Sequence, residues 1–177
     1  MKSIGLISDT HSYLDPKVLD HFNDCDEIWH AGDIGDIQVA DQLEAAKKFK
    51  AVHGNIDGGK VKITYPEHHF FVCEGFSIWL THIAGRPGAY ARGIKEQLNK
   101  RKPDILICGH SHILRVQRDE KFNKMLYINP GAAGKHGFHK VRTLIKFKLD
   151  KGKIFDMNAI ELGLRASLDP SENQFYE

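Results

Sequence analysis

Apolar and polar positions alternate in short blocks along the first part of the chain. Three apolar runs end in polar or glycine-containing residues, which is typical of buried strands that lead into loops; they span residues 2–8, 27–31 and 51–53. Residues 16–22 begin with a proline and residues 37–49 place apolar side chains at a period near 3.6, so both segments are predicted to be helices. Strands that alternate with helices in this way predict a parallel sheet with crossover helices.

The remainder of the chain is richer in β-prone segments. Residues 69–73 and 76–81 flank Glu74-Gly75, a spacing that indicates a β-hairpin. Residues 89–101 predict a helix that Pro103 ends, and a strand follows at 104–108. Further β-prone runs predict an antiparallel second half, at residues 114–116, 125–128, 144–149 and 153–159. We expect one α/β domain over residues 1–162 and a polar C-terminal tail over residues 163–177.

Composition narrows the class of protein. With 177 residues and 41% hydrophobic residues, the chain can bury a core, and its apolar runs are far shorter than the roughly 20 residues that cross a bilayer. The first residues lack the long apolar segment of a signal peptide, and three cysteines at unrelated spacings favour free thiols in a reducing cytosol. We therefore expect a cytoplasmic protein. The near balance of 25 basic and 23 acidic residues gives no nucleic-acid signal.

Side chains of the types that bind metals follow five of the predicted strands. They are Asp9 and His11 after the first strand, Asp33 after the second, Asn55 after the third, His82 after the hairpin, and His110 and His112 after the strand at 104–108. Ligands of open α/β sheets bind beyond the carboxyl ends of the strands. We therefore expect these seven side chains to converge on one edge of the molecule, although they are spread over about a hundred residues.

The chemistry of the seven side chains indicates a metal centre. Neutral imidazoles and carboxylates bind Mn, Fe, Zn or Ni, whereas a thiolate site needs cysteine. Seven ligands exceed the needs of one ion once water is counted, so a bridging carboxylate would let two divalent transition-metal ions share them. Two ions about 3.5–4 Å apart can activate a water and clamp a phosphate.

Each motif also has a structural explanation when it is taken alone. A single histidine after a strand is usually solvated or satisfied, Gly-Asn is a turn signal, and Gly-Asp can be a helix cap. The complete ordered set, with every member at a strand end, has no such explanation. The metal-site interpretation therefore rests on the whole set.

The same blocks carry a family resemblance. The order Asp9-x-His11, Gly32-Asp33, Gly54-Asn55-x-Asp57, Thr81-His82 and Gly109-His110-x-His112 resembles the calcineurin-like metallophosphoesterase superfamily. The short chain and Asn129-Pro130-Gly131 resemble its small prokaryotic phosphodiesterase branch.

The resemblance implies a four-layer α/β/β/α sandwich with mixed sheets. It implies one ion held by Asp9, His11, Asp33 and His112, and a second held by Asn55, His82 and His110, with Asp33 as the bridge. Mn is the usual metal of such enzymes, and Fe, Zn and Ni stay open.

The predicted function is hydrolysis of a small phosphodiester by a metal-bridging hydroxide, with Asp33, Asn55, His82 and His110 as catalytic residues. Two alternatives stay open. One is a non-catalytic scaffold of the same fold, as in a eukaryotic retromer subunit, and the other is a phosphomonoesterase. The complete ligand set favours an enzyme over the scaffold, because a scaffold is free to lose ligands.

The sequence departs from the family pattern at two positions. Ile56 stands where the common Gly-Asn-His-Asp block has a histidine that assists the leaving group, and Ile83 stands where a glycine often follows the motif histidine. Members of the small branch often lack the former histidine as well, so the first departure does not exclude activity. The second departure removes no ligand.

Residues near the motifs have weaker claims to a role. Asp36 and Asp57 either orient the ligands or are ordinary loop and cap residues. Asn129-Pro130-Gly131 predicts a tight turn beneath the site. His136 and His139 either reach a substrate phosphate or, the favoured interpretation, lie in a solvated loop, and a structural role is expected for His21, His30, His68 and His69.

Overall fold

The first strand, β1 (Lys2–Ile7), sends its side chains into two different apolar layers. Ile4 and Leu6 enter one buried cluster, and Ile7 enters another on the opposite face. This alternation is expected of a strand that is covered on both sides. The computed structural model describes residues 1–166, and β1 is the central strand of the first of its two large sheets.

The first sheet has the strand order β12-β11-β1-β2-β3. β1, β2 (Glu27–His30) and β3 (Lys48–Ala51) run parallel, as predicted, with α1 (Pro16–His21) and α2 (Ile37–Ala46) as the crossover helices. The antiparallel hairpin of β11 (Val141–Asp150) and β12 (Lys153–Leu164) completes the sheet, with β11 beside β1.

The second sheet has the strand order β4-β5-β8-β10-β9. It contains β4 (His68–Cys73), β5 (Phe76–Thr81), β8 (Ile105–Ile107), β9 (Leu114–Asp119) and β10 (Met125–Pro130). The smaller elements are α3 (Gly59–Thr64), the hairpin of β6 (Gly85–Arg86) and β7 (Ala89–Tyr90), α4 (Ile94–Arg101) and a 3₁₀ turn at Glu120–Phe122.

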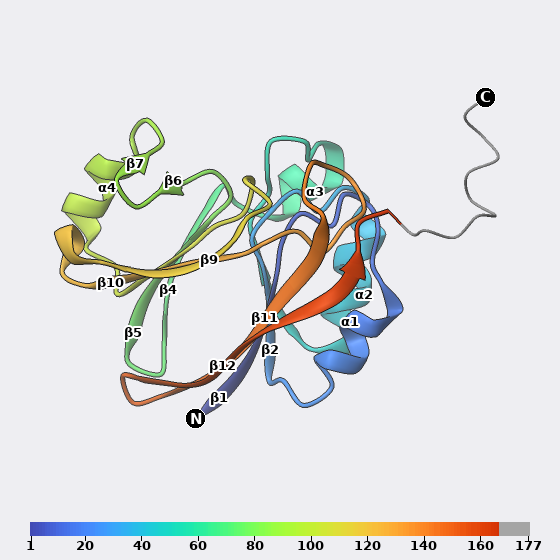
Figure 1. Ribbon diagram of the computed structural model, residues 1–177, viewed down its shortest axis with the longest axis horizontal. Helices are drawn as coiled ribbons and strands as arrows, with labels where there is room; N and C mark the ends of the chain where they lie inside the picture. Colours follow the sequence, from blue (N-terminus) through green and yellow to red (C-terminus); the bar gives the residue numbers. More distant parts are fainter. Residues whose placement is uncertain (167–177) are drawn as a thin grey trace.

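The elements stack in four layers, as Figure 1 shows from α4 on one side to α1 and α2 on the other. Apolar side chains of both sheets, among them Trp29, Leu80 and Ile107, form one buried cluster between the sheets. A second cluster packs α1 and α2 against the outer face of the first sheet, and a third packs α4 against the second sheet. The predicted α/β/β/α sandwich is confirmed.

Several predicted elements were wrong in detail. The helix predicted at 89–101 begins only at Ile94, because residues 85–90 form the β6–β7 hairpin and Gly93 takes a left-handed φ of +81°. The helix predicted to reach residue 49 ends at Ala46, since residues 48–51 pair with β2 as strand β3. The second half is not wholly antiparallel, because β8 runs parallel to both β5 and β10.

The chain passes the predicted boundary at residue 162 without a break. Strand β12 continues through Gly163 and Leu164, paired with Arg142 and Val141 of β11. The rest of the predicted polar tail, residues 167–177, lies outside the described residues, and the single domain over 1–162 stays a prediction. Among residues 1–166, no helix has the length and apolar character needed to span a membrane.

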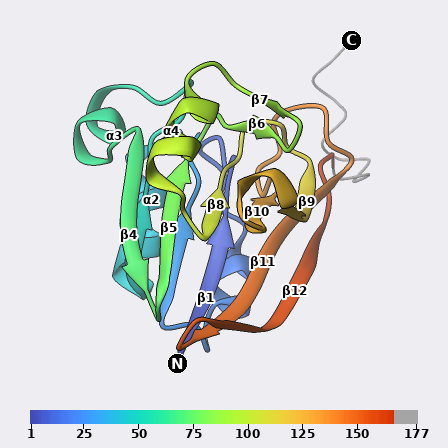
Figure 2. The same ribbon diagram turned by 90° about the vertical axis from the view of Figure 1, so that its left-hand side faces the viewer.

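The parallel strands bring their carboxyl ends to one end of the molecule. β1, β2 and β3 point the same way, as do β5, β8 and β10, and the N-terminus lies at the opposite end in both views (Figures 1 and 2). Backbone hydrogen bonds join the loops there, for example from Asp9 N to the Gly32 carbonyl and from Gly109 N to the His82 carbonyl. This end carries the candidate site.

Candidate metal centre

The structure brings all seven predicted ligand residues together. Asp9 and His11 follow β1, Asp33 follows β2, Asn55 follows β3, His82 follows β5, and His110 and His112 follow β8. Their donor atoms gather in two groups of three, each group within 4.8 Å, with Asn55 beside the second.

The first group consists of Asp9, His11 and His112. His112 Nε2 lies 3.1 Å from Asp9 Oδ1 and 3.3 Å from His11 Nε2. Asp9 is fully buried, so its carboxylate cannot be solvated by bulk water and needs a positive partner.

The second group consists of Asp33, His82 and His110, and Asn55 joins it. His82 Nε2 lies 3.2 Å from Asp33 Oδ1, while Asn55 Oδ1 lies 3.1 Å from His82 Nε2 and 2.9 Å from His110 Nδ1. His82 and Asp33 are both buried.

Asp33 links the two groups through its two carboxylate oxygens. Oδ1 faces His82 in the second group, and Oδ2 lies 3.7 Å from His11 Nε2 in the first group. The backbone N–H of Ile56 also donates to Oδ1, at 3.1 Å, which holds the carboxylate in place. Asp33 therefore has the position that a bridging ligand requires.

The hydrogen bonds of His82 show that this residue fits a cation. His82 Nδ1 lies 2.8 Å from the carbonyl oxygen of Ala31, which can only accept, so Nδ1 carries a hydrogen. In the neutral ring, Nε2 then presents a lone pair to a carboxylate oxygen, an arrangement that needs a cation or a proton between them. Donor atoms that share one ion at about 2.0–2.2 Å lie about 3–3.5 Å apart, and the closest separations here match.

The electrostatics of the histidines agree with this interpretation. Burial lowers the pKa of His11 and of His110, against the opposing pull of Asp33 and Asp9, so both rings stay neutral and keep a lone pair for an ion. Burial also disfavours the charged form of His82, but Asp33 and Asp9 outweigh burial and raise its pKa. The two carboxylates therefore favour a positive charge at this position.

The backbone at the site adopts conformations that are costly for non-glycine residues. Five of the seven ligand residues have left-handed φ values: Asp9 (54°), His11 (46°), Asp33 (55°), His110 (68°) and His112 (57°). Such residues persist only where the surrounding structure holds them, and they concentrate at functional sites. No spacing in the sequence indicated this strain.

At two motif positions, glycine is required because there is no room for a Cβ atom, and not because the backbone must be flexible. A Cβ on Gly54 would collide with the Asp33 carboxylate and backbone, and a Cβ on Gly109 would collide with Ser8 Oγ and approach Asp9 Oδ2. Both glycines therefore let one loop lie directly against the carboxylate supplied by another.

Of the two aspartates with weaker claims, only Asp57 supports the site. The buried Asp57 carboxylate accepts from the N–H groups of Ile34, Gly35 and Gly54, at 3.1, 2.7 and 2.8 Å, and so ties the loop of Asp33 to the loop of Asn55. Asp36 is the N-cap of α2 and accepts from Gln38 N, so the cap interpretation of Asp36 is the correct one.

Asn129 holds the loop that carries His110 and His112. Its buried side chain donates to the Gly109 carbonyl at 2.8 Å and to Ser111 Oγ at 3.1 Å, and its Oδ1 accepts from Gly131 N. The tight turn predicted at these residues was wrong: Asn129 and Pro130 belong to β10 and pair with β9, and the chain leaves the strand at Gly131, which has a left-handed φ of +76°.

His136 is an exposed loop residue, as the favoured interpretation expected, whereas His139 is half-buried and hydrogen-bonded, so the solvated-loop interpretation was wrong for His139. The His136 ring lies 5.1 Å from the His11 ring, and His139 Nδ1 lies 3.2 Å from His112 Nδ1. His139 Nε2 is 3.0 Å from the Gly134 carbonyl, so Nε2 carries the hydrogen and Nδ1 accepts from His112. This order leaves His112 Nε2 free to bind an ion.

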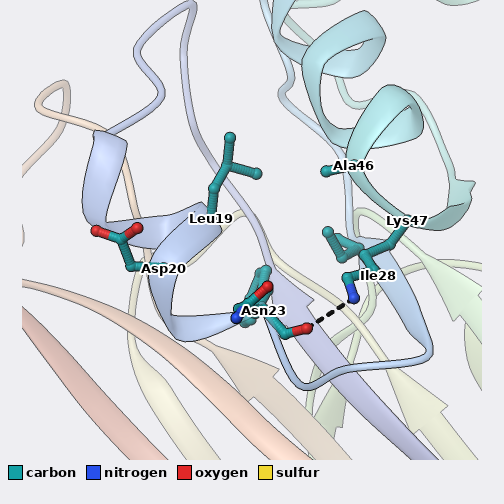
Figure 3. Close-up of a pocket in the computed structure, with 7 residues that line it drawn as sticks. Leu19, Asp20, Asn23, Ile28, Ala46 and Lys47 are labelled. Carbon is teal, nitrogen blue, oxygen red and sulfur yellow. Dashed lines mark hydrogen bonds between the residues drawn. The ribbon is translucent and has the colours of Figure 1, made fainter.

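A cavity elsewhere in the molecule has no such chemistry. It measures about 610 Å³ and lies between α1 and the end of α2, on the outer face of the first sheet (Figure 3). Lys47 Nζ donates to the Asn23 carbonyl across it, at 2.7 Å. None of the seven ligand residues lines this cavity, so the candidate site stays at the carboxyl ends of the strands.

Comparison with known proteins places the chain in a family. The calcineurin-like phosphoesterase superfamily domain matches residues 1–152, so this chain belongs to that superfamily. It is 33% identical over 138 residues to a probable metallophosphoesterase of Methanothermobacter thermautotrophicus, a match that covers 73% of this chain and 76% of the relative. A probable metallophosphoesterase of Methanocaldococcus jannaschii is 31% identical over the same share of this chain and 67% of its own.

Solved structures share the fold. The solution structure of Thermotoga maritima protein TM1076 is 26% identical, with a TM-score of 0.67 over 90% of this chain and 100% of that chain. Vps29 of Chaetomium thermophilum is 16% identical, with a TM-score of 0.72 over 92% of this chain and 97% of that chain. The predicted superfamily is thus confirmed, and its fold is shared with Vps29 proteins.

Proposed function

We propose that this protein is a dinuclear metal-dependent phosphodiesterase. The observation that carries the proposal is Asp33, whose two oxygens face two separate groups of donor atoms. Asp9, His11, Asp33 and His112 would hold one ion, and Asp33, Asn55, His82 and His110 the other. The nitrogen and oxygen donors suit Mn, Fe, Zn or Ni, and we favour Mn because it is the usual metal of the superfamily that the sequence resembles.

The chain's own residues would prepare the site for a phosphoester. When bound, two such ions supply an activated water and offset the negative charge of the phosphoryl oxygens. Asp33 and Asp9 hold the site's negative charge in buried positions, and the Ala31 carbonyl and His139 orient the rings of His82 and His112. The substrate we propose is a small phosphodiester, because the site lies in a cavity of about 430 Å³ rather than on an extended basic surface.

The setting we propose is a reducing cytoplasm. The three cysteines, Cys25, Cys73 and Cys108, are free and buried among the residues that the structure describes. Neither a membrane nor a nucleic acid is part of the proposal.

Colour release from bis-p-nitrophenyl phosphate tests the proposed activity. We expect hydrolysis that depends on added Mn and exceeds hydrolysis of the monoester p-nitrophenyl phosphate. Asp33→Asn should lose both ion binding and rate. Faster monoester hydrolysis would favour the phosphomonoesterase alternative. If the metal-loaded protein hydrolyses neither substrate, the result would favour the scaffold alternative.

A further inference from the structure

A cavity of about 430 Å³ opens over the metal centre, and three exposed apolar side chains surround its mouth. They are Ile56, Ile113 and Phe138, with 48%, 58% and 104% of their surface exposed. They come from three different loops, after β3, after β8 and after β10. Single exposed apolar residues are common, but three that converge on a polar site are typical of a ligand-binding cavity.

The loop that carries Phe138 is held in place on both sides of the ring. Gly137, with a φ of +119°, packs so tightly against His112 that a Cβ there would collide with Nδ1 of that ring. His139 contacts His112 and the Gly134 carbonyl. The backbone of this loop is thus anchored to the site, while the Phe138 side chain is fully exposed at the cavity.

The opposite side of Asn55 has a different character. A second cavity of about 260 Å³ shares Asn55 with the first, and its lining includes His53, Lys62 and Glu67. The two sides of the metal centre therefore differ, one apolar with an aromatic ring and one polar with charges. A phosphoester bound between them would meet unlike surfaces at its two ends.

We propose that Ile56, Ile113 and Phe138 form an aromatic subsite, which binds a flat aromatic group carried by a phosphoester. The inference rests on the proposed function, because it needs the phosphoryl group at the metal centre. An aromatic group fits better than a long alkyl chain because the lining includes two aromatic rings, Phe138 and His136, and aromatic pairs gain packing energy beyond the area that they bury. Phe138 is the specificity-determining residue of this subsite.

Binding of two phosphonates to the Mn-loaded protein tests the subsite without turnover. Phenylphosphonate and methylphosphonate share the phosphoryl group and have no ester bond to cleave, so calorimetric titration measures the contribution of the ring. We expect the wild-type protein to bind phenylphosphonate about tenfold more tightly, the size of one stacked ring. In Phe138→Ala the ratio of the two dissociation constants should fall below about threefold, and Phe138→Trp should restore it.

Val72→Ala is the matched control. Val72 is an apolar side chain on β4 with 75% of its surface exposed and lies outside both cavities, so its loss should leave the tenfold ratio intact. A wild-type ratio near one, an unchanged ratio in Phe138→Ala, or no binding of either phosphonate would overturn the subsite. Equal binding of butylphosphonate and phenylphosphonate would overturn its aromatic character.

The two proposals fail in different ways. Hydrolysis of bis-p-nitrophenyl phosphate without a phenyl preference would remove the subsite and leave the enzyme. A phenyl preference that depends on Phe138, without hydrolysis of any phosphoester, would support the subsite and remove the catalytic function.

Discussion

Ile56 combines two features that bear on the chemistry of the leaving group. Its backbone N–H holds the Asp33 carboxylate at 3.1 Å, while its side chain lies at the mouth of the cavity, where the common family block has a histidine. The backbone contact survives any substitution except proline, so only the proton-donating function of a histidine is missing. Nothing in an isoleucine side chain can protonate a departing oxygen.

The enzyme is therefore expected to depend steeply on the pKa of the leaving group. A general acid typically contributes about 10²–10⁴-fold, and it matters most for poor leaving groups such as alkoxides. Aryl diesters should be hydrolysed well and alkyl diesters poorly, and Ile56→His should flatten the dependence if the ring fits. The measurement is a rate series over diesters of graded leaving-group pKa. A flat dependence in the wild-type protein would mean that another acid, such as His136, already acts.

His139 is expected to control the affinity of one ion. Because it accepts a hydrogen bond from His112 Nδ1, its loss frees the His112 ring to rotate or to change tautomer. His139→Ala should weaken Mn binding at one of the two sites by about tenfold or more, and His139→Asn should recover part of the loss. Titration calorimetry resolves the two binding steps. His21→Ala, a histidine substitution on α1, is the control, and equal affinities in the His139 and His21 variants would contradict this role.

Buried polar side chains connect the loops that form the site. Asp57 connects the loop after β2 to the loop after β3, and Asn129 connects β10 to the loop after β8. These contacts explain how residues with unfavourable φ values keep a single conformation. Hydrogen bonds to a buried carboxylate are stronger than those between neutral groups, so Asp57 contributes strongly to holding the loops in one conformation.

Asp57→Ala is expected to destabilise the protein by about 2–4 kcal/mol, because three buried or partly buried N–H groups lose their acceptor. It should also weaken Mn binding, since the loops of Asp33 and Asn55 lose their connection. Asp36→Ala is the matched control: it removes an exposed helix cap, should cost about 1 kcal/mol, and should leave Mn affinity intact. Urea unfolding and metal titration of both variants distinguish the two roles, and equal effects would contradict them.

A buried ionic cluster lies at the end of the molecule opposite the site. Glu27 is 1% exposed, accepts from Trp29 Nε1 at 3.0 Å and pairs with Lys2 at 2.5 Å and with Lys50. Lys50 Nζ also lies 5.2 Å from the centre of the Phe71 ring on the second sheet. The cluster thus joins β1, β2 and β3 to the facing sheet.

This cluster is expected to make stability depend on pH in acid. Burial opposes ionisation of Glu27, but hydrogen bonds from Lys2, Lys50 and Trp29 outweigh it and lower its pKa from 4.5 to about 2. The contribution of Glu27 is therefore complete above about pH 4.5 and is lost as the pH falls through about 2. Glu27→Gln should reduce the free energy of unfolding by about 3 kcal/mol at pH 7, and the difference should shrink between pH 4.5 and 2.

The exposed pair of Asp24 and Lys146 provides the control for that prediction. Asp24 has 69% of its side chain exposed, so Asp24→Asn should change the free energy of unfolding by less than about 1 kcal/mol. Urea unfolding of both variants across this pH range is the measurement. A difference for Glu27→Gln that stays constant down to pH 2 would show that its carboxylate is not the stabilising group.

The sequence by itself determined the fold class and the set of side chains that meet at one end of the molecule. Period-two and period-3.6 patterns locate most strands and helices, because each element must bury one face. The seven proposed ligand residues were recognisable because their types are specific and each follows a strand. These features are local, so the order of residues carries them.

Only the tertiary structure decided which residues support those seven and how the loops are shaped. The helix predicted at 89–101 yields to a hairpin at 85–90, and the helix predicted to reach residue 49 yields to pairing with β2, because long-range contacts outweigh local propensity. No motif includes His136, Phe138 or His139. Their positions depend on a loop that contacts His112, 27 residues earlier in the chain, and His11 after β1. Contacts between residues far apart in the chain leave no spacing to read, so the support and specificity of the site became visible only in three dimensions.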